Sequence, residues 1–132
     1  MSTQIPDEFR ALLTGPNFAH LATTMKDGSP QVTPVWVDLE DDLVIINTAD
    51  GRVKANNMDR TGKVALSVAD PENPYRYIQV RGEVAEKTHE DADKHIDEMA
   101  KKYMGVDTYP YHDPNVTRVI FKVRPTSVQT YG

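Results

Sequence analysis

Two basic residues, Arg52 and Lys54, follow directly after an expected strand and turn, where their positions favour the binding of an anion. Residues 43–48 form an apolar, β-branched run of strand length, and Asp50-Gly51 breaks it. Residues 52–58 then have the length and composition of a short helix, with Asp50 as the expected N-cap. Because the first turn of a helix already carries partial positive charge, two cations there are unfavourable unless an anion neutralises them. Strand, turn, helix start and cations together favour a phosphate cradle.

The spacing also leaves a second interpretation open, in which these two cations are solvated side chains beside Asp50 and Asp59. The rest of the sequence offers little that could do chemistry. It contains no cysteine, and its four histidines share no metal-ligand spacing. One of them, His95, is expected to be a core or interface residue. Nucleotide-binding glycine motifs and a Gly-x-Ser-x-Gly motif do not occur. An enzyme with this sequence therefore needs a bound cofactor to carry the reaction, and we expect no metal.

Length and composition indicate one soluble globular domain, residues 1–132. The formal net charge of -5 and the isoelectric point near 5.3 argue against a nucleic-acid-binding protein. The first residues lack the basic and apolar regions of a signal peptide, and no apolar run approaches membrane-spanning length. We therefore expect a cytoplasmic protein that binds neither nucleic acid nor membrane.

The patterning predicts six short strands joined mostly by tight turns. Asp27-Gly28 is a typical hairpin turn, Pro34 places its strand at an edge or at a bulge, and Gly82 suggests a bend. The expected strands are residues 18–25, 31–39, 43–48, 63–69, 77–87 and 117–129. Antiparallel strands of this length and punctuation suit a small closed β-barrel, because closure removes exposed edges.

Helices are expected at the periphery of this barrel. Residues 6–15 form a short amphipathic helix that Gly15-Pro16 ends. The clearest helix spans residues 88–104, where Thr88 and Asp91 resemble a capping box and lysines occupy the last turn. The predicted architecture is thus mainly β, a six-stranded barrel with peripheral helices.

The order of these pieces resembles a known family. The segments Leu21-Ala-Thr-Thr-Met-Lys-Asp-Gly-Ser-Pro-Gln-Val-Thr-Pro-Val-Trp36, Gly51-Arg-Val-Lys-Ala-Asn-Asn57 and Val80-Arg-Gly-Glu-Val84 resemble the pyridoxamine 5′-phosphate oxidase-like superfamily of flavin-binding split β-barrels. The resemblance covers nearly the whole chain. The short chain and the Arg-Val-Lys segment followed by Asn56-Asn57 look most like the actinobacterial branch that uses the deazaflavin coenzyme F420 rather than FMN.

The resemblance implies a Greek-key split barrel and a homodimer with two cofactor sites at the subunit interface. Arg52 and Lys54 would hold the cofactor phosphate, the strand from Gln31 to Trp36 would lie along the ring, and Tyr77 could reach the cleft. The cofactor-binding residues implied are Gln31, Thr33, Pro34, Val35, Trp36, Thr48, Arg52, Val53, Lys54, Asn57 and Tyr77. Trp36 could equally be a core residue. The family's oxidases carry further basic residues near the C-terminus for a pyridoxal phosphate substrate, and Val128–Gly132 lacks them.

The implied activity is hydride transfer from reduced coenzyme F420 to an electron-poor conjugated small molecule of quinone, enone or tetrapyrrole type. In this picture the protein supplies orientation, an apolar wall and phosphate binding, and no residue is expected to be catalytic. Two alternatives stay open at this point. The first is an FMN-dependent oxidoreductase of the same barrel, and the second is a carrier that binds a cofactor or metabolite without turnover.

Overall fold

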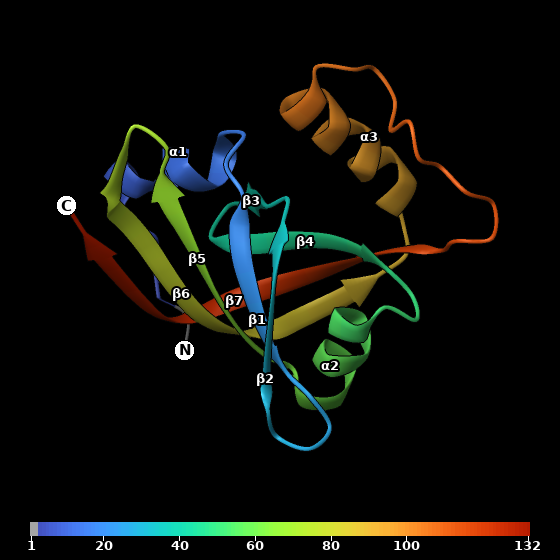
Figure 1. Ribbon diagram of the computed structural model, residues 1–132, viewed down its shortest axis with the longest axis horizontal. Coiled ribbons are helices and arrows are strands. Elements are labelled where there is room, and N and C mark those ends of the chain that lie inside the picture. The colour runs from blue at the N-terminus through green and yellow to red at the C-terminus, as the bar shows by residue number, and fades with distance from the viewer. Residues whose placement is uncertain (1–2) are drawn as a thin grey trace.

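The computed structural model describes residues 3–132, which form one strongly twisted antiparallel sheet and three helices (Figure 1). Hydrogen bonds join seven strands in the order β2-β1-β5-β6-β7-β4-β3. The strands are β1 (Ala19–Thr24), β2 (Pro30–Val35), β3 (Asp38–Glu40), β4 (Leu43–Ala49), β5 (Lys63–Asp70), β6 (Asn73–Thr88) and β7 (Arg118–Tyr131). The helices are α1 (Asp7–Thr14), α2 (Val53–Thr61) and α3 (Ala92–Met104). The mainly β prediction is confirmed.

The prediction of six strands is wrong, because the expected strand 31–39 divides into β2 and β3. The break lies at Val37, whose backbone bonds to side chains of α3 instead of a neighbouring strand. Its N–H donates to Oη of Tyr103 at 2.9 Å, and its carbonyl accepts from Nζ of Lys102 at 2.7 Å. The edge position predicted from Pro34 is confirmed, because β2 is the first strand of the sheet and needs no donor on its outer side.

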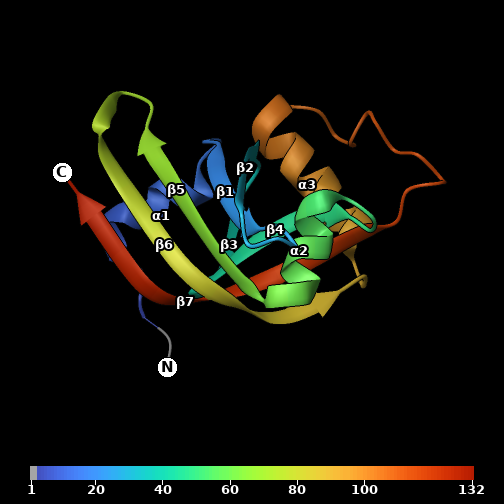
Figure 2. The same ribbon diagram turned by 60° about the horizontal axis from the view of Figure 1, so that its bottom comes forward.

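The expected closure of the barrel is not seen within residues 3–132: β2 and β3 are the two ends of the sheet and do not pair. The sheet instead curls so that both halves enclose one apolar core (Figure 2). Leu21, Leu66 and Val80 from one half belong to the same buried cluster as Ile46 and Phe121 from the other. Apolar burial of this kind supplies the main driving force for folding. The architecture is that of a split barrel, with an open seam between its edge strands.

The turns follow the sequence prediction closely. The hairpin at Asp27-Gly28 is closed by the amide of Met25, which donates to the carbonyl of Ser29 at 2.8 Å. The bend predicted at Gly82 is a change of register between β6 and β7. A Cβ atom at Gly82 would lie 2.6 Å from the carbonyl oxygen of Arg124 and from a methyl group of Val123, so only glycine allows this close approach.

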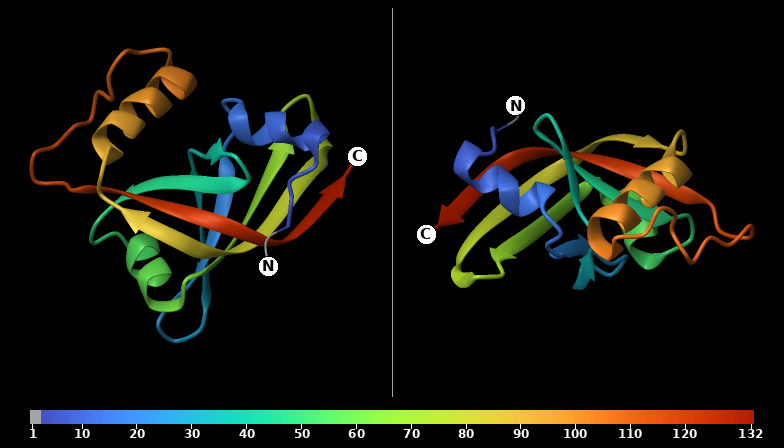
Figure 3. Two further views of the ribbon diagram at one scale, coloured as in Figure 1. Left: turned by 180° about the vertical axis from the view of Figure 1, so that it is seen from behind. Right: turned by 90° about the horizontal axis from the view of Figure 1, so that it is seen from above.

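Helices α1 and α2 lie toward opposite ends of the curled sheet (Figure 3). The expected helix 6–15 appears as α1, which buries Phe9, Leu12 and Leu13. Two capping predictions are wrong. Asp50 does not cap α2, whose N-cap position is Arg52, because the carboxylate of Asp50 instead contacts His89 at 2.8 Å.

Helix α3 begins at Ala92, four residues later than expected. Thr88 is still part of β6, and its hydroxyl accepts the amide of Glu90 instead of capping the helix. One face of the helix is apolar, and its Ala92, Ile96 and Met99 are buried. In residues 3–132 we find no helix that combines the length and the apolar character needed to cross a membrane.

Candidate functional site

One cavity of about 230 Å³ lies where the end of β2 and the segment after it meet the end of β4 and the start of α2. Helix α3, the loop that follows it and the first residue of β7 complete the walls. Segments far apart in the sequence therefore converge here. The residues that line the cavity are Phe18, Pro34, Val35, Trp36, Asn47, Thr48, Arg52, Lys54, Ile96, Tyr109, Tyr111 and Arg118.

Three cations face this cavity. Arg52 is the N-cap residue of α2, Lys54 lies in its first turn, and Arg118 begins β7. The register of β4 and β7 pairs Ala49 with Arg118, which explains how Arg118 comes close to the start of α2. None of the ion pairs within residues 3–132 includes any of the three cations.

The mutual repulsion of the three cations favours the binding of an anion between them. Burial and the positive charges of Arg52 and Arg118 lower the pKa of Lys54 below its ordinary value. Burial also lowers the pKa of Arg118, which Arg52 lowers further. The start of α2 has no side-chain cap, so the partial positive charge of its first turn adds to these cations. A phosphate at this position would relieve the repulsion and accept charge-assisted hydrogen bonds.

Aromatic side chains form a second part of the cavity wall. Trp36 stacks on Tyr103 with ring centroids 5.0 Å apart and planes 10° apart. Tyr109 meets Trp36 edge to face at 6.1 Å, and its own ring lies 5.5 Å from the guanidinium carbon of Arg118. Tyr103 is fixed in turn by its hydroxyl, which donates to the carbonyl of Asn17 at 2.7 Å. Burial raises the pKa of Tyr103 to about 12, so this hydroxyl remains a donor.

The loop between α3 and β7 closes one side of the cavity. A carboxylate oxygen of Asp97 on α3 accepts the backbone N–H of Tyr109 at 2.8 Å and lies 2.7 Å from Nε2 of His112. These two hydrogen bonds lower the pKa of Asp97, so the carboxylate remains ionised in mild acid. Tyr109, which lines the cavity, is therefore held by a side chain that lies outside it.

The structure brings six residues of the implied cofactor set to this cavity and leaves five outside its lining. Those that line it are Pro34, Val35, Trp36, Thr48, Arg52 and Lys54. Those that do not are Gln31, Thr33, Val53, Asn57 and Tyr77.

The five outside the lining have other surroundings. Asn57 is buried and donates to the hydroxyl of Thr23 at 3.0 Å, and Gln31 accepts from the same hydroxyl at 2.9 Å. The hydroxyl of Thr33 is buried without a hydrogen-bond partner. Val53 is exposed at the start of α2, and the ring of Tyr77 stacks on Tyr131 at 6.0 Å. The role of these residues in cofactor binding stays a prediction.

Sequence reasoning missed Arg118, Asn47 and the two tyrosines of the loop. Arg118 is the second residue of the last expected strand, but only the pairing of that strand with β4 places it beside Arg52. Tyr109 and Tyr111 lie in residues 106–115, which the sequence predicts to be an irregular loop that meets the acceptor, but it singles out no residue of that loop. Among residues 3–132, no group of three or more histidine and acidic side chains is arranged to hold a metal ion.

The residues fit a planar cofactor with a phosphorylated tail. Three cations and an uncapped helix start suit the phosphate, and stacked aromatic rings beside the apolar Val35 and Ile96 suit a ring system. No side chain in the lining is a carboxylate that would repel the anion.

Comparison with known proteins gives one family and several related structures. The model of the pyridoxamine 5′-phosphate oxidase family matches residues 5–132. An F420 reductase of solved structure is 33% identical, with a TM-score of 0.83 over 95% of this chain and 98% of its own. No protein of curated function matches the chain significantly in sequence.

Two more distant structures show the same fold. The conserved hypothetical protein Rv2991 from Mycobacterium tuberculosis is 20% identical, with a TM-score of 0.74 over 98% of this chain and 86% of its own. HupZ from Group A Streptococcus is 22% identical, with a TM-score of 0.69 over 96% of this chain and 94% of its own.

Proposed function

Because the chain belongs to the pyridoxamine 5′-phosphate oxidase family, we propose that it is an oxidoreductase that binds reduced coenzyme F420 and reduces a conjugated small molecule. The observation that carries the proposal is the cavity in which stacked aromatic rings lie beside three cations that form no ion pair within residues 3–132. The 33% identity to an F420 reductase over nearly the whole length of both chains supports the deazaflavin.

In this proposal the protein's own residues bind the phosphate of the cofactor, orient its ring and shield that ring from water. Arg52, Lys54 and the first-turn amides of α2 bind the phosphate, and Thr48 adds a hydroxyl beside them. Trp36 and Val35 lie along the ring, and Tyr109 excludes water from it. The bound cofactor supplies the hydride, and the acceptor is an electron-poor quinone, enone or tetrapyrrole. Orientation and exclusion of water are thus the contributions expected of the chain.

FMN is the alternative cofactor, because its phosphate and ring would meet the same cations and aromatic wall. Without a suitable acceptor the same site would serve a carrier of cofactor or metabolite. We also propose a homodimer, because Val32, Tyr75 and Tyr131 are large apolar side chains left exposed on the sheet. Sedimentation of the pure protein at the mass of two chains is the expected result.

The test is a fluorescence titration of the pure protein with coenzyme F420 and, separately, with FMN. We expect micromolar binding of the deazaflavin and weaker binding of FMN. Lys54→Met keeps the apolar stem but removes the ammonium, so it should weaken binding of the deazaflavin at least about tenfold. Lys101→Met, an exposed lysine of α3 outside the cavity, is the matched control and should bind like the unaltered protein.

Catalysis is tested by the oxidation of reduced coenzyme F420 in the presence of quinone, enone or tetrapyrrole acceptors. Steady turnover with at least one class separates an enzyme from a carrier. If neither deazaflavin nor FMN binds, or if Lys54→Met binds as tightly as the unaltered protein, the proposed function is wrong.

A further inference from the structure

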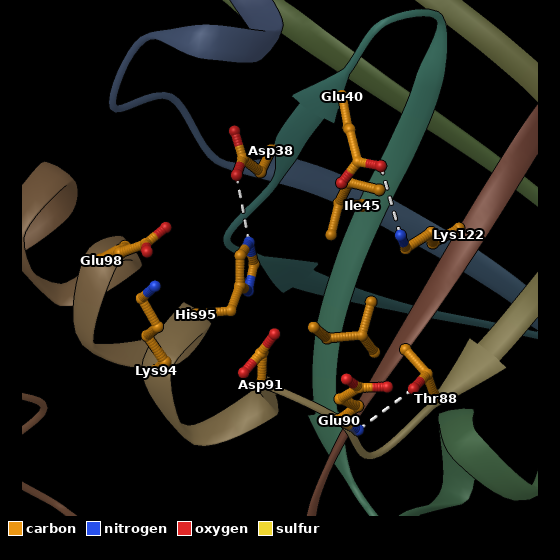
Figure 4. Close-up of a pocket in the computed structure, with 11 residues that line it drawn as sticks. Asp38, Glu40, Ile45, Thr88, Glu90, Asp91, Lys94, His95, Glu98 and Lys122 are labelled. Carbon is orange, nitrogen blue, oxygen red and sulfur yellow. Dashed lines mark hydrogen bonds and ion pairs between the residues drawn. The ribbon is translucent and has the colours of Figure 1, made fainter.

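Behind the cationic cavity lies a second cavity of about 210 Å³ with a different charge character, and His95 of α3 projects into it (Figure 4). The ring of His95 is largely buried, with 12% of its side chain exposed. Its Nε2 lies 3.0 Å from a carboxylate oxygen of Asp38 on β3. Its Nδ1 lies 3.0 Å from Nδ2 of Asn47 on β4, a residue that lines the cationic cavity. His95 therefore connects the two cavities.

The contacts of Asn47 fix the orientation of its amide. Its Nδ2 donates to the carbonyl of Ala92 at 2.9 Å, and its Oδ1 accepts from Nε of Arg118 at 3.0 Å. A carbonyl only accepts and a guanidinium only donates, so the oxygen must face Arg118 and the nitrogen must face Ala92. The second hydrogen on Nδ2 then points at His95.

This orientation dictates the tautomer of His95. Its Nδ1 must accept from Asn47 and carries no proton, so the proton of the neutral ring is on Nε2 and is donated to Asp38. Burial pushes the pKa of Asp38 upward, but the hydrogen bond from His95, the N–H of Leu39 and the charge of Lys102 outweigh it. The pKa of Asp38 is therefore lowered, and its carboxylate accepts from His95.

A second proton on His95 cannot be accommodated without loss of a contact. Protonated Nδ1 would point a hydrogen at the NH₂ group of Asn47, where two donors repel. Rotation of the amide by half a turn would satisfy His95 but would set Oδ1 against the carbonyl of Ala92 and the NH₂ group against Nε–H of Arg118. The unrotated amide would lose its restraint by His95, whereas the rotated amide would leave Nε–H of Arg118 without its side-chain acceptor. Only the 3.4 Å contact from Nη2 of Arg118 to the backbone carbonyl of Asn47 would then hold the guanidinium on this side.

We propose that His95 is a positioning residue, which in its Nε2-protonated neutral form holds Asn47 and, through it, aims Arg118 into the anion-binding cavity. Arg118 keeps this direction as long as His95 is neutral, and protonation of His95 releases it. Asp38 stabilises the required tautomer from the far side. The arrangement itself is independent of the ligand, and only the identity of the bound anion rests on the proposed function.

Other charged groups face His95 from every element around the second cavity. They are Asp38 and Glu40 of β3, Glu90 and Asp91 before α3, Lys94 and Glu98 of α3, and Lys122 of β7. Most of these side chains are acidic, whereas the NH₂ group of Asn47 meets Nδ1 of His95 as a donor. Lys122 is already engaged by Glu40 at 3.2 Å. The geometry at Asn47 therefore links the proton on Nδ1 of His95 to the direction of Arg118.

The first test needs no ligand. Nitrogen-15 NMR of the histidine side chains at about pH 7.5 should show an unprotonated Nδ1 and a protonated Nε2 for His95. The Nε–H signal of Arg118 should be sharp at this pH and should broaden as the pH falls to about 5.5, across the range in which histidines titrate. In His95→Gln, which cannot titrate, the signal should persist. An Nδ1-protonated His95, or identical behaviour of Arg118 in both proteins, overturns the proposal.

The second test is the affinity for coenzyme F420 over the same pH range. The unaltered protein should lose about five- to tenfold more affinity than His95→Gln, and His89→Gln, a partly exposed histidine outside both cavities, should follow the unaltered protein. Equal losses in all three proteins overturn the proposal.

Asn47→Asp, which supplies Arg118 with a carboxylate, should weaken binding at every pH, and unchanged binding would count against the proposal. If no protein binds the deazaflavin, the proposed function fails, and the NMR result still decides the role of His95.

Discussion

The two cavities next to Asn47 are nearly equal in size, but they differ in whether their charged side chains are paired within the protein. In the cavity around His95, the partly buried charges have partners within the protein: Asp38 accepts a hydrogen bond from His95, and Lys122 forms ion pairs with Glu40 and Glu86. In the cavity around Trp36, three cations gather at an uncapped helix start, and none of them joins an ion pair within residues 3–132.

This difference separates charges that are paired within the protein from charges that are free to bind an anion. An internally paired charge contributes modestly to stability and leaves no demand for a further ion. Clustered like charges, in contrast, destabilise the free protein, and they persist where a bound group later neutralises them. Removal of an ion-paired charge from the cavity around His95 should therefore lower stability, whereas removal of a cation from the cavity around Trp36 should lower binding.

The largest effect is expected when the cation pair of α2 is removed. The double variant Arg52→Gln with Lys54→Gln should lose at least about 100-fold in affinity for coenzyme F420, because two charge-assisted hydrogen bonds to phosphate disappear. The free variant should melt no lower than the unaltered protein, because mutual repulsion is relieved. Isothermal titration and thermal unfolding measure the two quantities. A large fall in melting temperature would show that the cations serve the fold.

The second effect is a loss of binding in alkali. Because the pKa of Lys54 is lowered, its ammonium loses its proton at a lower pH than an ordinary lysine, and affinity for the anion should fall about tenfold as the pH rises through that value. Over the same interval the free protein should gain stability, since the unfolded chain binds this proton more tightly.

Lys54→Arg provides the comparison for this pH profile, because a guanidinium stays charged throughout. Its affinity should remain level where that of the unaltered protein falls. Titrations at closely spaced pH values compare the two. Parallel profiles would place the titrating group elsewhere.

A smaller effect is expected from the loop that closes the cationic cavity. Asp97→Asn removes the charge that holds the amide of Tyr109 and the ring of His112, and affinity for the cofactor should fall about threefold through the looser loop. Hydrogen exchange at the amide of Tyr109 should quicken in the free variant. Unchanged exchange would mean that other contacts hold the loop.

The smallest effect on binding is expected in the second cavity. Lys122→Met breaks the ion pairs with Glu40 and Glu86, whose side chains are more than half exposed, so the free energy of unfolding should fall by only about 0.5 kcal/mol. Affinity for coenzyme F420 should not change. Denaturant unfolding and titration of the same sample measure both quantities, and a clear loss of affinity would remove the distinction between the cavities.

Glycine and proline positions in the sequence predicted the turns, bends and strand edges that depend on backbone preferences alone. The turn at Asp27-Gly28, the irregularity at Gly82 and the edge position of Pro34 each follow from the backbone preferences of one or two residues. The break at Val37 could not be predicted in this way, because its backbone partners are Lys102 and Tyr103, more than sixty positions later. Tertiary contacts overrode a strand pattern that alternates without interruption.

In the candidate site, too, residues with a local sequence signal could be predicted, and residues that depend on distant strand pairing could not. Arg52 and Lys54 were identifiable because two cations at a helix start conflict with the local electrostatics. Arg118 and Asn47 carry no such local conflict, and they reach the cavity only through the pairing of β4 with β7. The capping role predicted for Asp50 failed for a related reason, since His89 from another part of the chain engages its carboxylate.

The two prolines of β2 have a consequence for the behaviour of the protein at high concentration. An open sheet presents the amides of its outermost strand to any passing chain, and such templates seed aggregates. Pro30 and Pro34 remove two of those amides from a six-residue strand, so a second chain cannot form a continuous ladder of hydrogen bonds with β2. The two prolines thereby protect the open edge of the sheet at β2 from pairing with further chains into a fibril.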